Sequence, residues 1–151
     1  MGTVTYREPA VVETVNGLFV PIQVNVKEDS SRPIVERYRH VWTPDIRVLG
    51  ADGFDYYHWN GYLPPFEFVP RLLVGQAQAR LRSRDFAGAA NVYEDLLRRF
   101  PTSEAAPEAQ YFLAAAKYEA SQNPTELHAG WHRLQTRYPD SPWRVRQSYS
   151  E

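Results

Sequence analysis

Residues 41–68 restrict the fold more than any other part of the sequence. Two strand-like runs flank Asp52-Gly53 there, and this dipeptide is one of the strongest hairpin signals because such turns need a positive φ that glycine adopts freely. Pro44 has no N–H to donate and therefore fits the first residue of the first strand. Pro64 and Pro65 fit the first turn of a helix. We expect a strand, a second antiparallel strand and then a helix.

The preceding residues predict a further strand and a crossover. Residues 18–26 alternate, with one apolar face that predicts a half-buried strand and consists of Val20, Ile22, Val24 and Val26. Pro33 then opens a short helical pattern that leads to Pro44. A strand, a helix and a strand in this order predict a right-handed parallel crossover. Further upstream, Glu8-Pro9 begins a short helix that Asn16-Gly17 is expected to end.

This part of the sequence resembles the closing half of the thioredoxin fold. The resemblance rests on Trp42-Thr43-Pro44, on residues 46–49 with the Asp52-Gly53 turn, and on residues 61–68, and it covers about residues 3–74. It implies a cis Thr43–Pro44 bond and a substrate groove lined by Thr43 beside a redox Cys-x-x-Cys turn. The sequence contains no cysteine, and Met1 stands where that turn would just have ended.

From residue 69 onward the sequence is alanine-rich and helical in its periodicity. Apolar residues recur at steps of three and four from Phe86 to Phe100, after an Asp85 cap, and two more helices follow Ser103 and Pro124. The segment Leu-x-x-x-Phe-Pro-Thr-Ser around Pro101 recurs as Leu-x-x-x-Tyr-Pro-Asp-Ser 38 residues later. Such a repeat predicts stacked helix pairs. It resembles tetratricopeptide repeats, although the first helix and the period depart from the consensus.

Together these patterns predict an α/β chain of two parts. Residues 1–74 are expected to form a partial thioredoxin-like βαββα body, and residues 75–151 are expected to form tetratricopeptide-like helical hairpins. Two helical repeats are fewer than a self-sufficient array needs. We therefore expect the helices to pack against the thioredoxin-like body or against another copy of the chain.

Composition excludes several classes of partner. A formal charge of −1 gives no reason to expect nucleic acid, and no apolar run is long enough to predict a membrane span. The chain as given carries no export signal, which favours the cytoplasm; the periplasm is the alternative if further residues precede Met1. Without cysteine there is neither a structural disulfide nor a thiolate metal site.

Few residues suggest chemistry, and we assign neither a cofactor nor a catalytic residue. His128 and His132 are one helical turn apart, but no third ligand is evident, so we predict no metal site. Asp52 is explained by the turn, and Asp55 sits beside it. Asp45 is unusual because it starts a strand. General acid–base catalysis would need carboxylates on opposite sides of a cleft, a geometry that the sequence does not establish.

The function expected from these features is noncatalytic. We predict a protein-binding module or scaffold that holds a protein or peptide near Trp42, Thr43 and Pro44, or in its helical part, and that self-associates. A possible interface is a set of aromatic residues: Tyr57, Trp59, Tyr93, Tyr118 and Trp131. For the strand aromatics Tyr57 and Trp59 core packing is favoured over an interface, because aromatic side chains are first of all large and apolar. The alternative is a thiol–disulfide oxidoreductase of the thioredoxin family whose Cys-x-x-Cys turn lies upstream of Met1.

Overall fold

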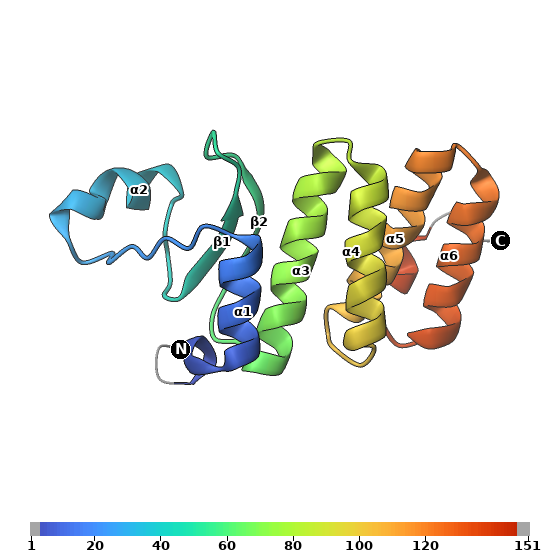
Figure 1. Cartoon of the computed structure of the whole chain (residues 1–151), viewed down its shortest axis with the longest axis horizontal. Coiled ribbons are helices and arrows are strands. Elements are labelled where there is room, and N and C mark those ends of the chain that lie inside the picture. The colour runs from blue at the N-terminus through green and yellow to red at the C-terminus, as the bar shows by residue number, and fades with distance from the viewer. Residues whose placement is uncertain (1–3, 148–151) are drawn as a thin grey trace.

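Helix α3 is the element on which most of the chain packs. The computed structural model describes residues 4–147, and α3 contacts α1, both strands, α4 and α5. In chain order the helices and strands are α1 (Pro9–Leu18), α2 (Arg32–Arg37), β1 (Asp45–Leu49), β2 (Asp55–Asn60), α3 (Pro65–Arg82), α4 (Phe86–Arg99), α5 (Ala106–Ser121) and α6 (Pro124–Arg137). Figure 1 shows the β1–β2 hairpin on one side of α3 and the stack of α4, α5 and α6 on the other.

The predicted hairpin is confirmed. β1 and β2 pair antiparallel, and the turn between them is closed by Gly50 N–H donating to Phe54 O at 2.8 Å. Gly53 has the positive φ of 79° that the turn was expected to need, and the Asp52 side chain accepts from Phe54 N–H at 3.0 Å. The sequence around Asp52-Gly53 therefore specifies this turn locally.

One face of the hairpin packs closely on α3. The register pairs Ile46 with Trp59 and Val48 with Tyr57, and the side chains of these pairs join the apolar core below. A Cβ atom on Gly75 of α3 would lie only 2.6 Å from Cγ2 of Val48. The absence of a side chain at residue 75 therefore lets the helix approach the sheet.

Helices α4 and α6 each begin at a residue whose side chain caps the helix. The Asp85 carboxylate accepts from Gly88 N–H at 2.9 Å at the start of α4, and Asn123 accepts from Thr125 N–H at 3.0 Å at the start of α6. Consecutive helices pack in pairs from α3 to α6. Their shared core contains Leu73, Tyr93 and Leu96, each 3% exposed or less.

The strand predicted at residues 18–26 is wrong. Helix α1 continues through Asn16-Gly17 to Leu18, and residues 19–25 have no regular secondary structure. Backbone groups of residues 20–24 form no hydrogen bond with the described residues 4–147, so the predicted parallel crossover is wrong too. The alternation was correct as a local pattern, but a strand also needs a neighbour to pair with, and the sheet of the described residues contains only β1 and β2.

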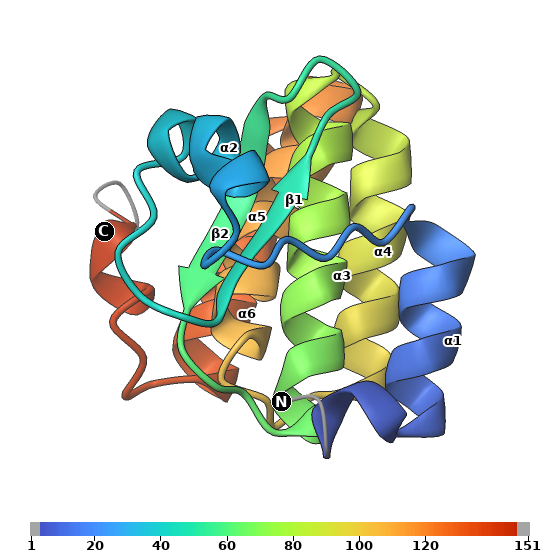
Figure 2. The same cartoon turned by 90° about the vertical axis from the view of Figure 1, so that its left-hand side faces the viewer.

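Residues 19–44 form a segment that we call the arm. It leaves the end of α1, contains α2 and returns to β1, and Figures 1 and 2 show α2 on the side of the hairpin that faces away from α3. Within residues 4–147, α2 contacts the short 3-10 helix Asp29–Ser31 that precedes it, but none of the other helices and neither strand. The arm is fastened to the hairpin turn by Tyr38, whose hydroxyl donates to Gly53 O at 2.9 Å, and by Arg37, which donates to Asp52 O at 3.2 Å.

The sheet and the helical stack are joined by buried polar contacts. The predicted division between residues 74 and 75 falls inside α3. Arg71 of α3 donates to Glu108 of α5 at 2.9 Å and to the hydroxyl of Tyr57 of β2 at 3.0 Å. Tyr57 also donates to Glu108 at 3.1 Å. The chain is thus a mixed α/β structure, mostly helical, in which one helix belongs to both parts.

Candidate binding site

The three residues predicted to bind a peptide lie together where the arm meets β1. Trp42 and Thr43 are exposed, and Pro44 is half-buried. The Thr43–Pro44 bond is cis, the isomer implied by the resemblance. Asn60 at the end of β2 donates to Trp42 O at 3.3 Å, and Gly61 N–H donates to Pro44 O at 2.9 Å. These two contacts hold the backbone of the predicted site against the end of the hairpin.

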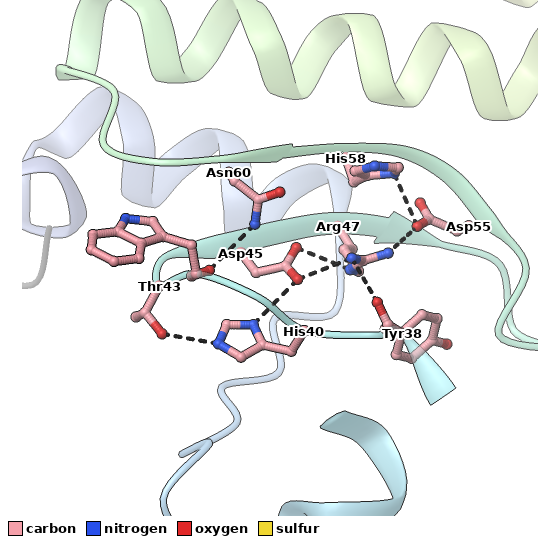
Figure 3. Close-up of polar contacts among 9 residues, drawn as sticks. Tyr38, His40, Thr43, Asp45, Arg47, Asp55, His58 and Asn60 are labelled. Atoms are coloured by element: carbon pink, nitrogen blue, oxygen red, sulfur yellow. Dashed lines mark hydrogen bonds and ion pairs between the residues drawn. The ribbon is translucent and has the colours of Figure 1, made fainter. Parts of the chain in front are cut away.

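Arg47 is the centre of a polar cluster on the face of the hairpin opposite to the one that packs on α3. Figure 3 shows this cluster. Its guanidinium donates to both oxygens of Asp45 at 3.0 Å and to Asp55 at 2.5 Å. It also donates to Tyr38 O in the arm at 3.1 Å. We call this group the Arg47 cluster. It connects the two strands to each other and both of them to the arm.

Burial and charge act in opposite directions on Arg47. Partial burial disfavours its charge, but the hydrogen bonds and negative charges of Asp45 and then Asp55 outweigh this effect, so the pKa of Arg47 lies above its ordinary value. A second interaction of Asp55 is with His58 Nδ1 at 3.1 Å. The cluster is therefore a stable anchor for the arm in which the guanidinium stays charged.

The hydroxyl of Thr43, the imidazole of His40 and the carboxylate of Asp45 lie next to one another in space, in that order. His40 Nε2 is 3.2 Å from Thr43 Oγ1, and His40 Nδ1 is 3.4 Å from Asp45 Oδ2. This order of groups can activate a nucleophile when the carboxylate supports the imidazolium. Here both oxygens of Asp45 already accept hydrogen bonds from Nε and Nη2 of Arg47. The arrangement is better suited to orienting Thr43 than to catalysis.

The most exposed apolar side chains of the arm lie on both sides of α2. Val20 is 88% exposed and Ile22 83% exposed before α2, and Val41 is 86% and Trp42 68% exposed after it. Trp42 offers a large ring that can be buried by a partner, and the backbone on which it sits is tied to Asn60. An exposed aromatic on a fastened backbone is typical of residues that anchor a bound chain.

The aromatic residues predicted to form an interface occupy different environments. Tyr93 is fully buried and Trp131 is 9% exposed, and Trp131 stacks on Tyr111 with ring centroids 5.7 Å apart. Tyr57 and Trp59 are half-buried against α3, as part of the core. Tyr118 on α5 is also half-buried. Core packing, the alternative considered from the sequence, accounts for the positions of four of these residues.

His128 and His132 are exposed on α6, and within residues 4–147 no three His, Cys, Asp or Glu side chains come together in a group that could hold a metal ion. None of the helices in this same part of the chain is long and apolar enough to cross a membrane.

The Arg47 cluster was only partly visible in the sequence. In the sequence, Asp45 is an unusual residue at a strand start, and Asp55 lies beside the turn. The sequence patterns predict no polar role for His40, Arg47 or Tyr38. Alternation in β1 could have placed Asp45 and Arg47 on one face of the hairpin, but the approach of the arm depends on contacts between distant residues.

Comparisons of the chain with protein-family models, with curated proteins and with solved structures found no match.

Proposed function

We propose that the chain is a noncatalytic protein-binding module, or scaffold, that holds a protein or peptide segment on the apolar side chains of its arm. The observation that supports this most directly is the exposure of Val20, Ile22, Val41 and Trp42 on one segment. Isolated exposed apolar residues are ordinary on protein surfaces, but the three most exposed large apolar side chains of the described residues, Val20, Val41 and Ile22, all belong to the arm.

The attachment of the arm supports the same function. The Arg47 cluster and the contact from Asn60 to Trp42 O hold one end of the arm in place, so a partner that packs on Trp42 would not have to order that backbone first. Less ordering on binding leaves more of the contact free energy as affinity. At the other end of the arm, backbone groups of residues 20–24 form no hydrogen bond within residues 4–147, so they are available to the backbone of a bound chain.

The proposal includes an origin of the chain from thioredoxin-like and tetratricopeptide-like proteins, which its sequence resembles. Both types of protein include members that hold other polypeptides, and the hairpin followed by stacked helices is compatible with each of them. The alternative activity, thiol–disulfide exchange, requires a thiolate, and this chain contains no cysteine. Nothing in the described residues favours that alternative.

The proposal is tested by selecting peptides from a displayed random library on the immobilised chain and titrating a selected peptide by calorimetry. Trp42→Ala should weaken the selected peptide by about thirtyfold, as loss of an aromatic anchor does. Phe54→Ala is the matched control, because Phe54 is also an exposed aromatic, 51% exposed, but lies in the hairpin turn. Failure to enrich any peptide, or equal affinity for the parent and Trp42→Ala, would refute the assignment.

A further inference from the structure

A groove on the helical stack is independent of the arm. It has a volume of about 460 Å³ and is lined by residues of α4, α5 and α6. α4 and α6 each pack on α5 but do not contact one another, and Figure 1 shows α5 between them. Leu97 and Leu113 line this groove together with four cationic side chains: Arg98, Lys117, Arg133 and Arg137. We call it the basic groove.

The four cations of the basic groove are not equally available. Lys117 is paired with Glu94, the one acidic residue of the lining, at 2.6 Å. Arg98 is paired with Asp95 on its own helix. Arg133 and Arg137 form no ion pair with any of the residues 4–147, and both are exposed on α6. Two guanidinium groups, one helical turn apart, therefore face solvent without a carboxylate.

We propose that the basic groove binds an acidic segment of a protein partner, with carboxylates that pair with Arg133 and Arg137. A guanidinium presents a planar fork of donors that matches a carboxylate. Side chains four residues apart on a helix lie on the same face, so the two arginines can donate to two carboxylates that have the same spacing on a helical partner.

A nucleic acid fits the groove less well than an acidic peptide. The chain as a whole has a formal charge of −1, and Lys117 and Arg98 are already neutralised by Glu94 and Asp95. Affinity for nucleic acid depends on several cations that each neutralise a phosphate.

The test is fluorescence anisotropy with a fluorescein-labelled helical peptide that carries two glutamates one turn apart on either side of a leucine. The parent chain should bind this peptide saturably, and the double variant Arg133→Glu and Arg137→Glu should bind at least about tenfold more weakly. Arg32→Glu, which reverses an exposed charge on α2, is the matched control and should bind like the parent. Circular dichroism confirms that the double variant keeps its helices.

Three results would overturn the inference: no saturable binding of the peptide by the parent, equal binding by the double variant, or displacement of the peptide by a single-stranded DNA oligonucleotide more readily than by unlabelled peptide. The inference does not rest on the function proposed for the arm. Trp42→Ala should leave the affinity for the acidic peptide unchanged, so failure at one site is distinguishable from failure at the other.

Discussion

Truncation of Glu108 should destabilise the whole chain, because its carboxylate joins three elements. Glu108 on α5 accepts from Tyr57 of β2 and from Arg71 of α3. Its side chain is 8% exposed and that of Arg71 24% exposed. Burial raises the pKa of Glu108 more than the charge of Arg71 lowers it, so the ion pair itself is expected to contribute little net stability.

The cost of Glu108→Ala comes from the groups that remain. Arg71 would keep its charge in a mostly buried site without a counter-ion, and removal of one partner of a buried pair costs about 3–5 kcal/mol. Because Arg71 is partly exposed, we expect the lower end of that range, a loss of about 3 kcal/mol in the free energy of unfolding. For a chain of this size such a loss lowers the melting temperature by about 6–12 °C.

Thermal and urea unfolding of three variants separate this explanation from general damage. Glu108→Gln removes the counter-ion of Arg71 but retains an acceptor oxygen, so it should lose less stability than Glu108→Ala. The double variant Glu108→Leu and Arg71→Leu leaves no buried charge and should be more stable than Glu108→Ala. Asp29→Ala removes a fully exposed partner of Arg32 and should leave the melting temperature unchanged. A melting temperature of Glu108→Ala within 1–2 °C of the parent, about the shift expected from an exposed pair, would refute the reasoning.

The remaining predictions concern pH, packing, association and chemistry. Burial, with the charge of Glu108, raises the pKa of Tyr57 to about 12. The stability that protonated Tyr57 contributes is therefore complete below pH 10 and is lost as the pH rises to about 12. Urea titrations should show that the free energy of unfolding of the parent falls over this range by about 2 kcal/mol more than that of Tyr57→Phe. Gly75→Ala should lower the free energy of unfolding by about 1–3 kcal/mol, because the new methyl group would overpack against Val48. Gly17→Ala should be tolerated, because its methyl group would meet no atom within 4 Å. Equal melting temperatures for these two variants would contradict the close approach of α3 to the sheet. Light scattering at micromolar concentration should detect a dimer or larger species that Ile22→Lys reduces, and a monomeric parent would exclude self-association through the arm. Purified chain should reduce insulin no faster than buffer, since it has no thiol, and measurable reduction would contradict the noncatalytic assignment.

Features that depend on neighbouring residues were predictable from the sequence. The Asp52-Gly53 turn, the Asp85 cap and the Asn123 cap each form through contacts within three residues, so local chemistry is sufficient to specify them. Residues 18–26 show the limit of this reasoning. Their alternation favours a strand, but pairing requires a partner strand, and local sequence does not say whether one is within reach.

The candidate sites were less predictable because they combine distant residues. Trp42, Thr43 and Pro44 were identified through a family resemblance, and exposure of the first two agrees with a surface role. The contact from Arg47 to Tyr38 in the arm and the contact between Tyr57 and Glu108 depend on how the elements pack. Aromatic residues such as Tyr93 could not be divided between core and surface until their helix had a known orientation.

Hydrogen–deuterium exchange along the arm, with and without a selected peptide, tests the central proposal most directly. In the free chain the amides of Val20 and of residues 22–24 have no hydrogen bond within residues 4–147 and should exchange quickly. The account predicts that a saturating peptide slows exchange in these amides and around Trp42, while exchange in α6 stays the same. Protection confined to the helices, with the exchange of the arm unaltered, would contradict a binding site on the arm.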